Sequence, residues 1–251
     1  MRILLTAFNA FGGEKINPTE ILLNRLDEVR RKANLPESVK TDRLFLPTEF
    51  LRASELLKQK LLTPEKPSEV DGKVGGVNAE SIQADVGGGG GRCEARPRTY
   101  DAVLALGQAG GRCKLSLERI AINIADSAVA DNCGMTLQDA KIQRDGAAAY
   151  FATLPIRPIL NAGLAAGVPF EISNSAGTYV CNYIMYNILY WAEQNSLGGK
   201  AAWRGGFLHV PFLPEQTLAV KAPCMSLTMM EDGLAVCLQK IVAEGDNDER
   251  K

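Results

Sequence analysis

Residues 170–182 read FEISNSAGTYVCN, and this stretch carries the strongest signal for both the fold and the chemistry of the chain. Its apolar start, residues 170–173, predicts a buried strand, and the Ser, Ala and Gly residues that follow predict a turn. Residues 182–194 then show the periodicity of an amphipathic helix. The segment therefore predicts a strand, a short loop and a helix with Cys181 at its amino end, as in α/β proteins.

The position of Cys181 favours a reactive thiol. The first turn of a helix has unpaired backbone N–H groups and the positive end of the helix dipole, both of which stabilise an anion. We therefore expect the pKa of this cysteine to be lowered and its thiolate to be populated. The alternative is that Cys181 only packs beneath the helix, which is the more common situation for a cysteine.

A cysteine nucleophile needs a base that takes its proton and returns it to the leaving group. The chain contains one histidine, His209, within GGFLHVPFLP at residues 205–214. This apolar run between glycines and Pro211 predicts a buried strand that ends at a turn, where functional loops gather. His209 is thus the candidate base, and a purely structural histidine is the alternative.

Glu118 is the candidate third member of the site. It lies in GQAGGRCKLSLERIAINI, residues 107–124, where a glycine-rich loop follows the strand predicted at 101–106. A carboxylate that orients an imidazole and stabilises its cation completes the arrangement of nucleophile, base and orienting group. Alternatively, Glu118 is a surface acid paired with Arg119. The loop itself, GQAGGR, lacks the pattern of a nucleotide-binding loop but allows backbone amides to approach a ligand.

Strand and helix patterns alternate along the chain. Strands are predicted at 1–8, 39–46, 101–106, 117–124, 170–173 and 206–210. Helices are predicted at 18–33, 50–61, 147–154, 156–166, 182–194 and 225–243. This alternation indicates an α/β fold whose twisted sheet is largely parallel or mixed and has helices on both faces.

Composition limits the remaining possibilities. A chain of 251 residues with 46% hydrophobic and 23% charged residues suits one α/β domain over residues 1–251. Its Gly-, Pro- and charge-rich segment 63–98 predicts a flexible insertion. The formal charge of −1 predicts no nucleic-acid partner, and no apolar run reaches membrane-spanning length. Six cysteines without C-x-x-C spacing and one histidine predict no zinc site, and a cytoplasmic location is expected.

Five segments together resemble pyroglutamyl peptidase type I, also called pyrrolidone carboxyl peptidase: TAFNAFGGEKINP, LPT, GQAGGR with LSLERIAIN, SNSAGTYVCN and FLHVP. The resemblance runs in order from Met1 to about Ala243. It implies a three-layer α/β/α sandwich and a cysteine peptidase that removes N-terminal pyroglutamyl residues from peptides without a metal or cofactor. It also implies a homo-oligomer, commonly a tetramer. By this resemblance Cys181 is the nucleophile, His209 the general base and acid, and Glu118 the orienting residue.

A pyroglutamyl terminus is a neutral lactam, so its recognition calls for an apolar slot with a few hydrogen bonds. The resemblance places seven residues in or beside that slot: Phe8, Phe11, Thr48, Gln108, Val129, Tyr179 and Val180. The chain departs from the family pattern in DSAVADN, residues 126–132, where Ala128 replaces a usual Arg and Ala130 a usual Pro. Tyr179 replaces a common Phe, and its hydroxyl must find a partner.

Two other functions remain open from the sequence. One is a cysteine-dependent amidase or acyltransferase that acts on a different small amide. The other is a pyroglutamyl-binding protein whose turnover is weakened, because Ala128 withholds a charge that similar enzymes place near the sulfur.

Overall fold

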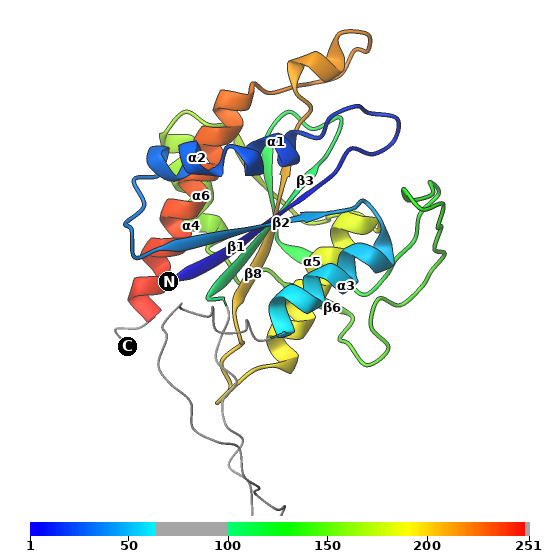
Figure 1. Cartoon of the computed structure of the whole chain (residues 1–251), viewed down its shortest axis with the longest axis horizontal. Coiled ribbons are helices and arrows are strands. Elements are labelled where there is room, and N and C mark those ends of the chain that lie inside the picture. Colours follow the sequence, from blue (N-terminus) through cyan, green and yellow to red (C-terminus); the bar gives the residue numbers. More distant parts are fainter. Residues whose placement is uncertain (64–99, 249–251) are drawn as a thin grey trace, which may run out of the picture.

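The computed structural model of the chain describes residues 1–63 and 100–248, which form a central sheet with helices on both faces (Figure 1). The predicted insertion at 63–98 lies outside the described residues except for Thr63. Among the described residues, a helix ends at Leu62, before residues 64–99, and a central strand begins at Ala102, after them.

The main sheet has six strands in the order β2-β1-β3-β8-β4-β7. Their bounds are Arg2–Phe8 (β1), Lys40–Leu46 (β2), Ala102–Gln108 (β3), Leu115–Glu118 (β4), Phe170–Ser173 (β7) and Arg204–Val210 (β8). Neighbouring strands are parallel except for β4 and β8, which pair antiparallel. The prediction of a largely parallel or mixed sheet is therefore confirmed.

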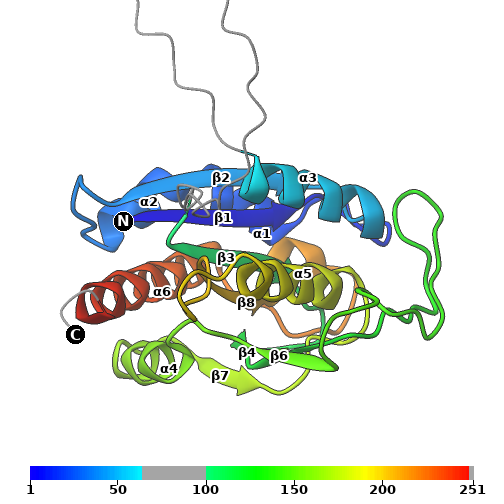
Figure 2. The same ribbon diagram turned by 90° about the horizontal axis from the view of Figure 1, so that it is seen from below.

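Helices cover both faces of this sheet, as the two perpendicular views show (Figures 1 and 2). One face carries α1 (Pro18–Asn24), α2 (Leu26–Lys32), α4 (Ile156–Ala165) and α6 (Leu227–Asp248). The other carries α3 (Phe50–Leu62) and α5 (Val180–Gln194). This is the expected three-layer sandwich. None of the described helices is both long and apolar enough to cross a membrane.

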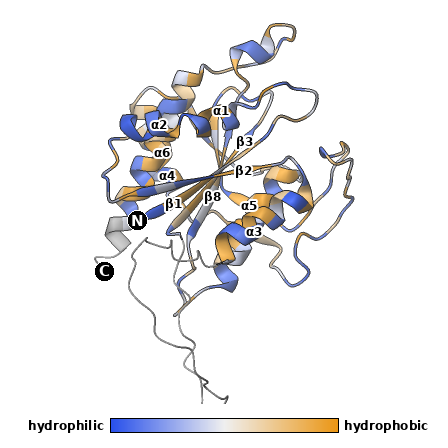
Figure 3. Cartoon of the chain, viewed as in Figure 1, coloured by the Kyte–Doolittle hydropathy of each residue, from blue (hydrophilic) through white to orange (hydrophobic). Residues whose placement is uncertain are grey.

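Strand alternation divides the core into two clusters, one on each face of the sheet. In β3, Leu104 and Leu106 point to the α1/α6 side, whereas Val103 and Ala105 point to the α5 side. Both sets are fully buried, and the apolar residues continue from the strands into α5 (Figure 3). Side chains two residues apart in a strand therefore share one face of the sheet.

Three predicted elements differ from the structure. Residues 147–154 are not helical: Ala149–Phe151 form β6, which pairs antiparallel with β5 (Ile120–Ile122) in a separate two-stranded sheet. For the same reason the predicted strand 117–124 is divided between the two sheets. A local Ala-rich pattern suits a helix, but cross-strand pairing with a distant segment decides the outcome here.

The predicted helix at 18–33 also divides, into α1 and α2, with a break at Arg25. The side chain of Arg25 forms ion pairs with Glu28 and with Glu231 of α6. The Glu231 side chain is 3% exposed. The beginning of α1 follows the prediction, because the side chain of Asn17 accepts a hydrogen bond from the N–H of Thr19 and Pro18 occupies the first turn.

Candidate active site

Cys181 is the second residue of α5. The helix begins at Val180, and its first backbone bond runs from the N–H of Tyr183 to the carbonyl of Tyr179 at 3.1 Å. Tyr179 is in the N-cap position, and its side chain does not cap the helix. The N–H groups of the first turn, including that of Cys181 itself, therefore remain available to an oxygen atom placed beside the sulfur.

The sulfur of Cys181 lies directly over β3. A Cβ atom built on Gly107 would be 2.9 Å from Sγ and 2.7 Å from the ring of Phe207, distances shorter than side-chain contacts allow. Only a residue without a side chain leaves this space. In the parallel pairing of β3 and β8, the residue opposite Gly107 is His209. The thiol therefore lies on the same face as the histidine and one strand away from its position.

Alternation along the strands brings the other two candidate residues to that face. Phe207 and His209 are two apart in β8, and Phe207 packs in the core beneath α5. In β4, Leu115 and Leu117 enter the opposite core, so Glu118 points toward α5. The antiparallel pairing of β4 with β8 then brings the carboxylate beside the imidazole.

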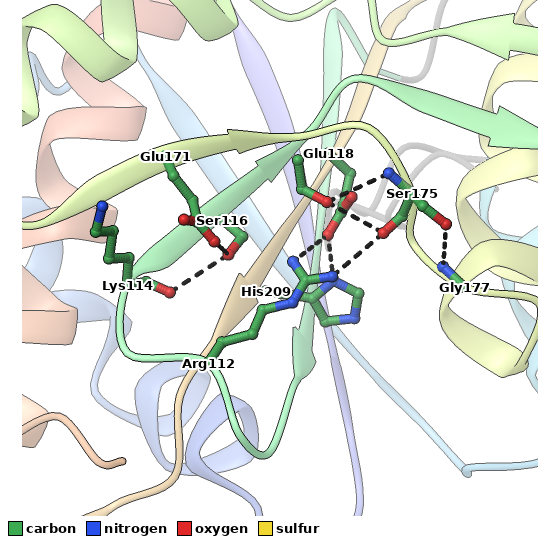
Figure 4. A network of polar contacts seen from close by, with 9 residues as sticks. Arg112, Lys114, Ser116, Glu118, Glu171, Ser175, Gly177 and His209 are labelled. Atoms are coloured by element: carbon green, nitrogen blue, oxygen red, sulfur yellow. Dashed lines mark hydrogen bonds and ion pairs between the residues drawn. The ribbon is translucent and has the colours of Figure 1, made fainter.

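His209 and Glu118 form a buried pair. Nδ1 of His209 and Oε1 of Glu118 are 2.7 Å apart, and the two residues are 4% and 0% exposed. Nη1 of Arg112 donates to the same carboxylate oxygen at 2.6 Å (Figure 4). The structure thus brings together the three predicted residues and adds a guanidinium that the sequence did not single out.

The protonation states of the pair follow from these contacts. Burial raises the pKa of Glu118, but hydrogen bonds and charge from His209, together with contributions from Ser173 and Arg112, outweigh it and hold this pKa below the usual value. Burial lowers the pKa of His209, and the attraction of Glu118 does not compensate. The pair is therefore a carboxylate and a neutral imidazole. Nδ1 carries the proton that it donates to Glu118, and Nε2 is left as the basic nitrogen.

The expected lowering of the Cys181 pKa is wrong. Although the residue keeps part of its surface exposed, the protein packed around its sulfur raises its pKa to about 12, and the charge of Glu118 acts in the same direction. Arg112 and the N–H of Cys181 oppose this shift but do not overcome it. Loss of water around the thiolate outweighs the helix terminus, so the resting residue is a thiol.

Three of the seven predicted pocket residues contribute aromatic rings near the start of α5. Phe11 lies 5.1 Å from Tyr179 between ring centroids, and Tyr179 contacts Phe50 edge-on at 5.2 Å. Phe8 is 2% exposed and belongs to the core, with its ring 6.4 Å from that of Phe207. The hydroxyl of Tyr179 donates to the carbonyl of Ala130 at 3.1 Å, which supplies the partner that the sequence required.

The other four pocket residues are placed differently from one another. Thr48 is buried, and its hydroxyl donates to the backbone carbonyl of Asn9 at 3.1 Å. Val180 is buried in the first turn of α5, whereas Val129 is 60% exposed. Oε1 of Gln108 accepts from Nε2 of Gln216 at 3.0 Å. Their contact with a substrate stays a prediction.

Two further side chains, those of Asn182 and Arg112, support the site, and neither was predicted from the sequence. Asn182 follows the cysteine, and its amide exchanges hydrogen bonds with the backbone of Ile122 and Ile124 at 2.9 to 3.0 Å. Arg112 belongs to the GQAGGR loop, whose glycines alone were considered as ligand contacts in the sequence. A polar residue beside the cysteine on a buried helix face was the available signal for Asn182, since such a group requires partners.

Asp131 organises the loop that carries Val129. Its carboxylate accepts from the backbone N–H groups of Phe50, Cys133 and Met135 at 2.8 to 3.0 Å, and also from the Cys133 thiol. Phe50 is the first residue of α3, so this carboxylate joins the loop to that helix. Burial raises the pKa of Asp131, but these hydrogen bonds outweigh it and lower the pKa overall.

We expect Asp131→Ala to lower the free energy of unfolding by about 1–3 kcal/mol at pH 7, because three N–H groups lose their acceptor. A lowered folded-state pKa gives stability that is fully present above the unfolded value, about 3.9, and is lost as the pH falls through the folded value. The deficit of the variant should therefore shrink below about pH 4. Urea unfolding at pH 7 and below about pH 4 measures this deficit in the free energy of unfolding. Asp126→Ala, at an exposed position of the same loop, is the control. A deficit that does not change with pH would contradict the carboxylate's role.

Comparison with known proteins agrees with this architecture. A family model described as pyroglutamyl peptidase matches residues 94–244. Pyrrolidone-carboxylate peptidase 1 of Caldanaerobacter subterraneus subsp. tengcongensis is 38% identical over 244 residues, covering 96% of this chain and 98% of the relative. Pyrrolidone-carboxylate peptidase of Staphylococcus haemolyticus is 36% identical over 98% of this chain and 96% of its own length.

Solved structures agree as well. The crystal structure of Bacillus amyloliquefaciens pyroglutamyl peptidase I superposes with a TM-score of 0.74 at 28% identity, covering 97% of this chain and 98% of the other. A mutant pyrrolidone carboxyl peptidase from Pyrococcus furiosus gives a TM-score of 0.75 at 31% identity, covering 97% and 99%. With its fold, a matching family model and relatives along nearly its whole length, the chain belongs to the pyroglutamyl peptidase family.

Proposed function

We propose that the chain is a cysteine exopeptidase that removes N-terminal pyroglutamyl residues from peptides. The observation that carries the proposal is the convergence of Cys181, His209 and Glu118 on the α5 face of the sheet. Family membership indicates which amide such a site cleaves. The relatives do not favour the alternative of an amidase for an unrelated small amide.

In the first half of the proposed reaction, Nε2 of His209 takes the proton from the Cys181 thiol as the sulfur attacks the carbonyl that links the pyroglutamyl residue to the peptide. A neutral resting pair is suited to this transfer, because the thiolate forms only when substrate is present. The first-turn N–H groups of α5 stabilise the negative oxygen of the tetrahedral intermediate. The imidazolium then gives its proton to the leaving amine, and a pyroglutamyl thioester remains.

In the second half, water attacks the thioester carbonyl and His209 takes one proton from it. Collapse of this second intermediate releases pyroglutamate, and the sulfur recovers its proton from the imidazolium. Glu118 remains a carboxylate throughout, since its contacts lower its pKa. It holds Nδ1 and stabilises each imidazolium as it forms.

The aromatic contacts near the start of α5 support a slot for the lactam. Phe11 and Tyr179 provide flat apolar surface beside the first turn, and Val180 lies in that turn. A substrate with no amino charge fits such a surface, whereas an α-ammonium group would lose its hydration without gaining a counter-charge.

A panel of three chromogenic amides tests the specificity. We expect the pyroglutamyl amide to be hydrolysed at least about 100-fold faster, as kcat/KM, than the prolyl or glutaminyl amide, because both of these carry an α-amine that must be desolvated. Equal rates on the three would favour a general cysteine amidase. Protection of the thiol from alkylation by pyroglutamate derivatives, without product formation, would indicate a binding protein with weakened turnover.

Other features of the proposal rest on the resemblance and the sequence. They are a homo-oligomeric, commonly tetrameric state, a cytoplasmic location, and a single domain over residues 1–251 interrupted by the insertion at 63–98.

A further inference from the structure

One charged side chain at the site has no part in the mechanism above. Arg112 lies in the loop between β3 and β4, and its side chain is 27% exposed. Nη1 donates to Oε1 of Glu118 at 2.6 Å, while Nη2 donates to the carbonyl of Ser175 at 3.2 Å (Figure 4). A single guanidinium therefore joins the carboxylate that holds His209 to the loop that leads into α5.

The carboxylate of Glu118 has few other partners to fix it. Oε1 accepts from both His209 and Arg112, whereas the buried Oε2 has no hydrogen-bond partner among the described residues. Ser173 lies opposite Glu118 in the pairing of β7 with β4, but its hydroxyl donates to the carbonyl of Ser175 at 3.1 Å. Without Arg112, the imidazole of His209 would be the one donor left on Oε1 among the described residues.

The contact with Ser175 reaches the nucleophile's side of the site. Ser175 lies in the turn between β7 and α5, six residues before Cys181, and its own hydroxyl accepts from the N–H of Gly177 at 3.1 Å. Arg112 thus holds the beginning of this turn at a fixed place relative to Glu118. A planar guanidinium that donates to two acceptors fixes Glu118 and Ser175 relative to each other, which a lysine ammonium does not.

We propose that Arg112 is a positioning residue, which orients Glu118 against His209 and anchors the turn before Cys181 to the same point. This inference rests on the proposed function, since it concerns the same reaction. Arg112 does not touch the reacting atoms. Its effect passes through the carboxylate and the turn, so its loss should alter turnover more than substrate binding.

Electrostatics predict the direction of the pH effect. The charged and titratable groups that act on the histidine are Glu118 from β4 and Arg112 from its loop, and Cys181 of α5 experiences the same two charges. Arg112 lowers the pKa of both His209 and Cys181. Removing it leaves the negative charge of Glu118 unopposed, so the imidazolium is stabilised and the pKa of His209 rises.

The test compares Arg112→Gln and Arg112→Lys with Lys114→Gln. Lys114 is an exposed cation of the same loop, and its side chain points away from Glu118 (Figure 4). With a pyroglutamyl chromogenic amide, we expect Arg112→Gln to lower kcat roughly 10- to 100-fold with KM within about twofold. The acid limb of its kcat/KM profile should move up by about one pH unit. Arg112→Lys should keep the acid limb and recover part of kcat, and Lys114→Gln should match the parent enzyme.

Because the chain has one histidine, NMR of the untagged protein reports the pKa of His209 without requiring activity. This pKa should rise in Arg112→Gln and stay unchanged in Lys114→Gln. In a double-mutant cycle, Arg112→Gln should lower kcat much less once Glu118→Gln has removed the carboxylate that the guanidinium orients.

Unchanged kcat and unchanged histidine titration in Arg112→Gln would overturn the proposal. So would a loss of activity that comes with lower thermal stability and an unshifted pH profile, because that result describes a purely structural residue. If Arg112→Gln does not fold, the lysine variant decides: full kcat there would exclude a role for the fork. Failure of the proposed function is separate, since it would appear as activity that survives Cys181→Ala.

Discussion

Replacing Cys181 by Ala should reduce hydrolysis of a pyroglutamyl chromogenic amide by about 10⁵-fold or more, because the sulfur that forms the thioester is lost. The variant keeps the first-turn N–H groups and the pair of His209 with Glu118. These groups could still polarise a bound amide, but they have no nucleophile to assist. The loss should therefore appear in kcat, and substrate analogues should still bind.

Cys224→Ala is the matched control, since this cysteine is exposed and lies in the segment that follows β8. It should retain the parent kcat/KM. The control matters because the sequence has six cysteines, so inactivation by iodoacetamide alone does not identify the residue. Mass spectrometry of the alkylated parent enzyme should show that modification of Cys181 accompanies the loss of activity. Substantial activity in Cys181→Ala, measured after purification from a host that lacks this enzyme, would exclude the mechanism.

Replacing Gly107 by Ala should also lower activity strongly, although the residue has no functional group. The added methyl would lie 2.9 Å from Sγ of Cys181 and 2.7 Å from the Phe207 ring. To accommodate it, the sulfur must move away from β3, the strand in which Gly107 lies opposite His209. A displacement of this kind should lower kcat/KM about 100-fold, while overpacking costs about 1–3 kcal/mol of stability.

Gly206→Ala separates the displacement of the thiol from the loss of stability by overpacking. Gly206 is in β8, and its added methyl would meet Leu154 at 2.8 Å on the opposite face of the sheet. We expect a comparable loss of stability in urea unfolding with activity per folded molecule preserved. If Gly107→Ala and Gly206→Ala lose activity in proportion to stability, the space over Gly107 would have no specific role in holding the thiol.

Local patterns in the sequence predicted much of this molecule. Residues 206–210 form a buried strand, as their apolar content predicts, and α4 follows from its periodicity. Phe170–Ser173 is a strand as predicted, but it lies at the edge of the sheet and only Phe170 is buried. The roles of Cys181, His209 and Glu118 were also open to prediction, since one histidine leaves one choice of imidazole base. The errors arose where the partner was distant: residues 149–151 pair with 120–122, which no local window contains.

The sequence by itself determined most of the strands and helices, the family and the three candidate residues, because hydrophobic periodicity and motif spacing are properties of neighbouring residues. The tertiary structure decided the protonation state of Cys181, which depends on how much water the packed protein excludes from its sulfur. It also decided the role of Arg112, whose two acceptors, Glu118 and Ser175, come from different strands and loops. Desolvation and charge act through space, so they are set only when distant segments meet.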